Sequence, residues 1–244
     1  MSSRLFNLSF VLCSSVLALA TTSAHAQQLG ATNAPAANAP AAKAPAAKVD
    51  AASQAIAEAA VKMDANDLDG AIAKLTDAIA ANPKLSGPYV FRASVYCQKK
   101  MWPEAEADFK AASAIDPTNV VIKFNLIEVK FNQKEYDKAR AGYATLTGNP
   151  QMGDLAAYKV FLCDLLAGHD AVAKKERDSF DQVDSKPSYY FSNAAWALVH
   201  KDTEGARSWL VSAANIYPSA KITYYVLPLK DLGYLPIPSA SSGI

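Results

Sequence analysis

The sequence predicts an all-α protein that consists of about five stacked helix pairs and ends in a capping helix. Four columns of residues recur every 34 positions, and within each repeat they follow the spacing i, i+3, i+7 and i+10. An amphipathic helix buries a stripe with that spacing. Pro83 and Pro117, also 34 apart, follow the expected second helices, where proline does no harm. The columns are Leu68, Trp102 and Tyr136; Ala71, Ala105 and Ala139; Leu75, Phe109 and Tyr143; and Ala78, Ala112 and Leu146.

The register divides the chain into repeats that run roughly over 52–85, 86–119, 120–152, 153–186 and 187–220. Each repeat is expected to hold a first and a second helix. The fourth repeat fits least well, because its second helix would contain the charged run 174–177. Beyond Pro218, residues 224–229 can form a last helix that covers the open end of the stack. Pro228 lies inside that helix and predicts that it is short or broken.

The repeat at 86–119 has large, small, aromatic and proline residues at regular positions, namely Tyr89, Ala93, Tyr96, Ala105, Phe109, Ala112 and Pro117. This pattern resembles the tetratricopeptide-repeat (TPR) family. The same positions return near the C-terminus as Tyr190, Ala194, Ala197, Ala206, Leu210, Ala213 and Pro218, with Ala at the third in place of an aromatic residue. The resemblance covers about 170 residues and implies a right-handed superhelical solenoid of TPR-like helix pairs.

The N-terminal 26 residues have the pattern of a secretory signal peptide. Arg4 provides the positive charge, an apolar stretch runs over 5–20, and Ala24-His25-Ala26 is a small-x-small cleavage site before Gln27. We therefore expect an exported protein, periplasmic or secreted, without a membrane span after cleavage. The alternative is that this segment is retained as an anchor.

Residues 27–50 form an Ala/Pro-rich linker in this interpretation. Three five-residue repeats begin at Ala34, Ala39 and Ala44, each with proline in its second position. Such spacing of proline opposes helix formation and favours an extended tether. The helical repeat domain then covers 51–230, and 231–244 form a C-terminal tail.

Charge and cysteine content limit the function further. Without residues 1–26, which hold one Arg, the chain has 23 basic and 23 acidic residues and no Lys/Arg cluster. This composition lacks the footprint of a nucleic-acid binder. The register places Cys97 and Cys163 two repeats apart, too far for a disulfide, so two buried free thiols are expected.

No catalytic motif is found in the sequence. The two histidines after the signal, His169 and His200, have no further ligands at zinc-binding spacing. Glycine loops for phosphate or dinucleotides and nucleophile motifs are also missing. We expect no catalytic residue, no cofactor and no metal, and a protein that is not an enzyme.

The resemblance implies that the first helices line a concave groove for a peptide or helix of another protein. That groove lacks the Lys and Arg of family members that bind a C-terminal carboxylate, so an apolar or basic segment suits it better. The sequence thus predicts a protein-interaction scaffold of the cell envelope or secreted space; the alternative is an envelope carrier that binds a small molecule or glycan in the groove. The candidate groove residues are Val90, Ser94, Gln98, Phe124, Glu128, Asn132, Phe161 and Asp164.

Overall fold

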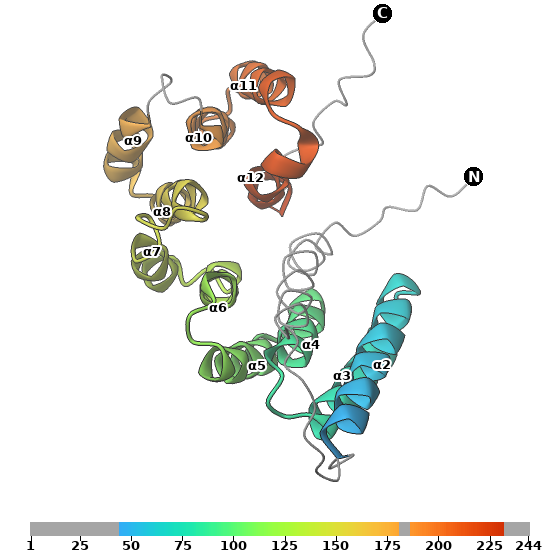
Figure 1. Ribbon diagram of the computed structural model, residues 1–244. Coiled ribbons are helices and arrows are strands. Elements are labelled where there is room, and N and C mark those ends of the chain that lie inside the picture. The colour runs from blue at the N-terminus through green and yellow to red at the C-terminus, as the bar shows by residue number, and fades with distance from the viewer. Residues whose placement is uncertain (1–43, 181–185, 232–244) are drawn as a thin grey trace, which may run out of the picture. The chain divides into compact units, whose positions relative to one another are not determined.

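The computed structural model describes residues 44–180 and 186–231, which form eleven α-helices and no strand (Figure 1). The protein divides into two compact units, with the boundary between Val129 and Lys130. The signal peptide expected at 1–26, the linker up to residue 43 and the tail after Asp231 lie outside the described residues. The expected all-α class is confirmed.

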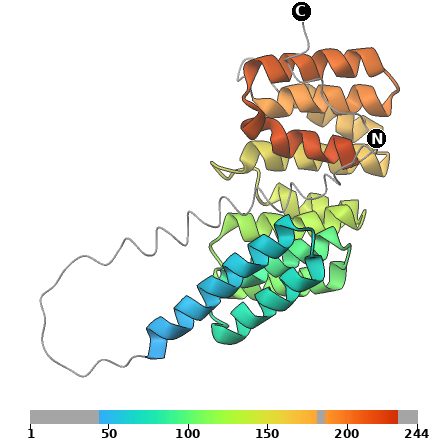
Figure 2. The same cartoon turned by 90° about the vertical axis from the view of Figure 1, so that its right-hand side faces the viewer.

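The N-terminal unit contains two complete helix pairs and most of a further first helix. Helix α2 packs on α3 (Figure 2), α3 packs on α4, and α4 packs on α5. The predicted starts of the second and third repeats coincide with the first residues of α4 and α6. The helices are α2 (Ala44–Asp64), α3 (Leu68–Ala81), α4 (Ser86–Gln98), α5 (Trp102–Ile115) and α6 (Val120–Asn132), the last of which extends past the boundary.

The C-terminal unit continues the same alternation. Helix α8 packs on α7, α9 and α10, and α10 packs on α11. The first residues of α8 and α10 are those predicted for the fourth and fifth repeats. The helices are α7 (Tyr136–Ala144), α8 (Gly153–Ala167), α9 (Asp170–Ser179), α10 (Pro187–Val199), α11 (Thr203–Ile216) and α12 (Ser219–Asp231).

Small and large residues of the repeat columns build the core. Ala71, Ala105 and Ala139 have no exposed surface, so the two helices of a pair approach closely at these positions. In the N-terminal unit Phe109 packs with Val90 and Ile122, which joins α5 to α4 and α6. The helix pairs therefore depend on their neighbours for burial, as in a repeat protein.

A residue in the left-handed region ends each first helix. Its φ lies between 58° and 81°, and it recurs at a spacing of 34 or 33 residues. This conformation reverses the chain towards the second helix. Glycine adopts it freely, yet only the fourth of these turns has one. The residues are Asn66, Lys100, Lys134, Gly168 and Lys201.

Two predictions about helix limits are wrong. Helix α2 begins at Ala44, inside the expected linker, because Pro45 falls in the first turn, where its missing N–H leaves no helix bond unmade. Helix α12 is longer than 224–229 and continues through Pro228. Pro228 and its neighbours Leu227 and Leu229 are buried, and this packing offsets the hydrogen bond that proline removes.

Both cysteines in the described part of the chain are free thiols. Cys163 is buried as predicted, whereas Cys97 is only half-buried. None of the described helices has the length and apolar character needed to cross a membrane.

Candidate partner-binding surface

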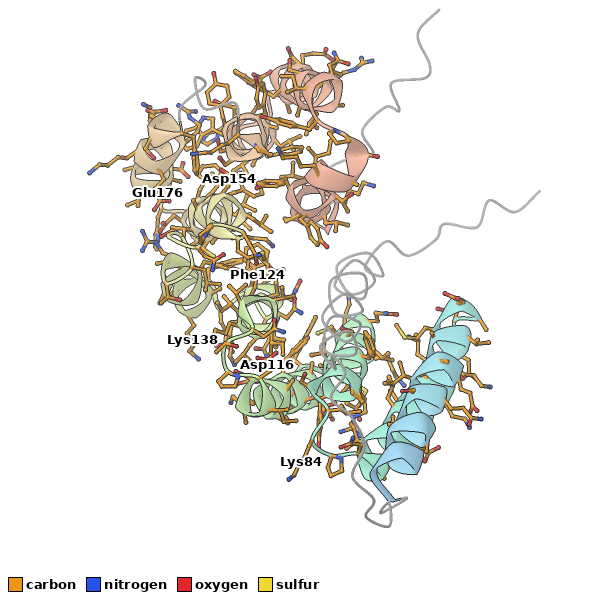
Figure 3. The ribbon with its side chains drawn as sticks, viewed as in Figure 1. Lys84, Asp116, Phe124, Lys138, Asp154 and Glu176 are labelled. Atoms are coloured by element: carbon orange, nitrogen blue, oxygen red, sulfur yellow. The ribbon has the colours of Figure 1, made fainter. Side chains whose placement is uncertain are left out.

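The eight residues predicted to line a groove are mostly buried within the protein. Gln98 of α4 and Asn132 of α6 are half-buried, and no more than 7% of any other member of the set is exposed. Phe124, for example, lies on α6 (Figure 3) with 4% of its surface exposed. Contact between these residues and a partner stays a prediction. Gln98 and Asn132 are the members of the set whose side chains are partly exposed to solvent. The buried members are Val90, Ser94, Phe124, Glu128, Phe161 and Asp164.

Two side-chain amides of the N-terminal unit have buried nitrogens without an acceptor. Gln98 Nε2 at the end of α4 and Asn125 Nδ2 on α6 have no hydrogen-bond partner among residues 44–180 and 186–231. A buried donor left without an acceptor costs roughly 1–3 kcal/mol. An incoming carbonyl or carboxylate oxygen reaches either nitrogen only if the amide side chain turns outward, and the new hydrogen bond would then remove this cost.

Asn125 was missed by the sequence reasoning. It stands between Phe124 and Leu126 in an apolar run, and an amide in such a run is the feature that could have identified it. The helical stripe assigned it to neither the core nor the groove. Only the structure shows that it is buried, with 9% of its surface exposed.

Arg92 of α4 is bound by its own chain. Its Nε donates to Asp108 Oδ2 at 2.7 Å, its Nη2 to Asp108 Oδ1 at 2.8 Å, and its Nη1 to Thr76 Oγ1 at 2.9 Å. Hydrogen bonding to Asp108 raises the pKa of Arg92 above its usual value. The guanidinium ties α3, α4 and α5 together, and these bonds occupy the donors that a partner's carboxylate would need.

Four charged or titratable side chains meet in the C-terminal unit, between α7, α8 and α9. Arg140 Nε donates to Asp164 Oδ2 at 2.5 Å, and Arg140 Nη2 donates to Glu176 Oε1 at 2.9 Å. His169 Nδ1 lies 3.2 Å from Asp164 Oδ1. Glu176 is labelled on α9 in Figure 3. Asp164 is thus held by two residues of its own chain, which weakens the case for its binding a basic segment of a partner.

The pKa of Glu176 is raised to about 7. Burial is the largest cause, the nearby Asp164 carboxylate adds to it, and Arg140 opposes both. Its second oxygen, Oε2, is buried without a hydrogen-bond partner in the described part of the chain. The group therefore changes its charge near neutral pH.

No cluster of metal-binding side chains is found in the described segments. Within 44–180 and 186–231, no group of three or more His, Cys, Asp or Glu side chains is arranged to hold a metal ion. A shallow depression of about 400 Å³ lies on α9. Its described lining residues all come from that one helix, so it gives no support to a small-molecule carrier; they are Ala171, Lys174, Lys175, Asp178 and Ser179.

Comparison with known proteins agrees with the repeat architecture. Residues 96–159 match the family model described as tetratricopeptide repeat. This segment extends from α4 to α8 and begins at Tyr96, one of the residues on which the resemblance to the family was based. No curated protein matches the sequence.

Several solved structures have a similar fold. PilF of Pseudomonas aeruginosa superposes with a TM-score of 0.53 at 16% identity over 77% of this chain and 87% of its own. PilW, described as a widely conserved type IV pilus biogenesis factor, gives 0.53 at 18% identity over 75% and 86%. The MamA protein gives 0.51 at 15% identity over 78% and 99%. At these identities the likeness shows the fold alone.

Proposed function

We propose that this chain, whose residues 96–159 match the tetratricopeptide-repeat model, is a scaffold of the cell envelope or secreted space that holds a segment of a partner protein. Proteins with this fold serve in general as protein-interaction scaffolds. The proposal adds the compartment and the binding groups. Its compartment rests on the signal-peptide pattern of residues 1–26. The likeness to PilW, a pilus biogenesis factor, agrees with a role in the envelope.

The observation that carries the proposal is the pair of unsatisfied amides on successive first helices. Gln98 ends α4, and Asn125 lies in the second turn of α6. A segment that crosses both helices would present backbone carbonyls, which are the acceptors that these nitrogens need. Backbone recognition of this kind suits a peptide better than a small apolar ligand.

Replacement of both amides by apolar residues of similar shape separates binding from folding. In the double variant Gln98→Met/Asn125→Leu we expect a free energy of unfolding that is unchanged or higher by about 1 kcal/mol per amide, since two unmade hydrogen bonds disappear. Partner capture should fall at least tenfold. The measurements are urea unfolding and a crosslinking pull-down from the envelope fraction with the chain from Gln27 onward, read by mass spectrometry.

Asn193→Leu is the matched control. Asn193 lies on the first helix α10, and its Nδ2 already donates to the Tyr189 carbonyl oxygen at 2.8 Å. We expect this variant to lose stability but to recover the same proteins as the wild type. Equal recovery by the double variant would exclude the two amides as binding groups, and recovery of no protein by the wild type would favour a small ligand.

A further inference from the structure

Helix α12 extends beyond the position of a simple end cap. In a repeat array each repeat contacts only its neighbours, so a cap that continues the stack would contact α10 and α11. Within the C-terminal unit α12 contacts α10 and α11 and also α8, the first helix of the repeat before (Figures 1 and 2). It therefore lies across the first helices of two repeats, where the family resemblance places a partner's helix.

Tyr225 fixes α12 to α8. Its hydroxyl donates to Asp154 Oδ2 at 2.6 Å, and its backbone oxygen accepts a hydrogen bond from the Tyr158 hydroxyl at 3.1 Å. Asp154, labelled in Figure 3, also accepts from the Ser188 hydroxyl at the start of α10. One carboxylate thus joins α8, α10 and α12.

Apolar contacts surround this polar anchor. The Tyr225 ring lies 5.4 Å from the ring of Tyr158 and 5.5 Å from that of Phe191, centroid to centroid. No more than 8% of any of the apolar residues that α12 buries is exposed. Ile222, Tyr225, Val226 and Leu229 follow the spacing i, i+3, i+4 and i+7 of the apolar stripe that an amphipathic ligand presents to a receptor. The buried residues are Ile222, Tyr225, Val226, Leu227, Pro228 and Leu229.

We propose that the face formed by α8 and α10 is a binding site for an amphipathic helix of a partner protein and that α12 occupies it as a built-in competitor. The ligand chemistry is that of α12, an apolar stripe with a tyrosine whose hydroxyl reaches Asp154. This inference rests on the proposed function, because a helix is displaced only if the protein binds partners. It concerns a different surface from the amides of α4 and α6.

The apparent affinity for a partner helix depends on the fraction of molecules in which α12 has dissociated from the face formed by α8 and α10. The apparent dissociation constant equals the intrinsic one divided by the fraction of molecules in which the face is free. A change that loosens α12 tenfold without altering the face raises the apparent affinity about tenfold. Tyr225→Phe is such a change, since it removes the hydroxyl from α12 and leaves Asp154 in place.

The test uses the full chain and a fluorescent peptide with the sequence of residues 219–231. Fluorescence anisotropy should show that the Tyr225→Phe chain binds this peptide about tenfold more tightly than the wild type, because only the peptide then has the hydroxyl for Asp154. A peptide that itself carries Tyr225→Phe should lose this advantage. Hydrogen exchange of wild-type α12 should become faster when the first peptide is added.

Tyr189→Phe is the control chain. Tyr189 lies on α10, and its ring packs on Tyr190 of the same helix and on Trp209 of α11, so we expect wild-type affinity. The proposal is overturned if neither the wild-type nor the Tyr225→Phe chain binds the peptide while circular dichroism shows both folded. It is also overturned if Tyr225→Phe forms dimers in light scattering, because the occupant would then be α12 of a second copy. Either result leaves the test of Gln98 and Asn125 intact.

Discussion

At the scale of single residues, Glu176 makes the stability of the C-terminal unit depend on pH. Its folded-state pKa of about 7 lies above the ordinary value of 4.5, so the folded state holds the proton more tightly. The resulting stabilisation is complete below about pH 4.5 and is lost as the pH rises to 7. The cause is burial beside Asp164, only partly offset by Arg140.

Glu176→Gln should remove this dependence, because glutamine has no charge to gain. We expect the variant to be more stable than the wild type by about 1 kcal/mol at pH 8, after allowance for partial exposure, and nearly equal to it at pH 4.5. Urea unfolding at the two pH values measures the difference. Asp178→Asn is the control. The hydrogen bond from Lys174 lowers the pKa of Asp178, so the change in the free energy of unfolding at pH 8 should have the opposite sign. A Glu176→Gln chain less stable than the wild type at pH 8 would contradict the argument.

The residue scale is also where sequence reasoning performed least well. The register placed Asp164 and Phe161 on the groove side of α8, yet both are buried. The repeat period fixes the direction of a side chain from its helix but not which neighbours then cover it. Arg140 comes from another helix, 24 residues away, and no pattern within a repeat pairs it with Asp164.

At the scale of elements, the turns between the paired helices contain a strain that can be relieved. Lys100 has φ 58° in a conformation that costs an L-residue roughly 1 kcal/mol and glycine almost nothing. Lys100→Gly should therefore stabilise the protein by about 0.5–1 kcal/mol, and Gly168→Ala, at φ 81°, should destabilise it by about 1 kcal/mol. Thermal unfolding of the two variants measures both effects.

Lys110→Gly serves as the control for this pair. Lys110 is exposed inside α5, where glycine costs about 1 kcal/mol relative to alanine, so the same substitution should destabilise. If Lys100→Gly destabilises as much as Lys110→Gly, the left-handed residue is not strained.

Element limits could largely be predicted, because they depend on local chemistry that repeats. Ser86, Val120, Gly153 and Pro187 begin first helices where the register placed them. The errors occurred where the surroundings override propensity. Pro228 remains inside a helix because its neighbours are buried. Burial depends on the packing of the whole chain, whereas the expectation that proline ends a helix considers only the local backbone.

At the scale of the whole molecule, the division into two compact units leads us to expect that a core substitution destabilises mainly the unit that contains it. Ala105→Leu overpacks the N-terminal unit and Ala206→Leu the C-terminal unit, where the alanines are 0% and 1% exposed. In an array whose stability is a sum of neighbour terms, each substitution should raise hydrogen exchange mainly in its own unit. Exchange of α3–α5 and α10–α11, followed by mass spectrometry in both variants, tests this. Equal loss of protection throughout would show a single cooperative fold.

The short connection between α11 and α12 has a consequence for partner choice. Only Tyr217 and Pro218 separate the two helices, so α12 is presented to its own face at a high effective concentration, at least of the order of millimolar. A free helix of equal intrinsic affinity would have to reach that concentration to compete. A partner already attached through another surface of the chain gains the same advantage of tethering, so bivalent partners are favoured over abundant monovalent ones.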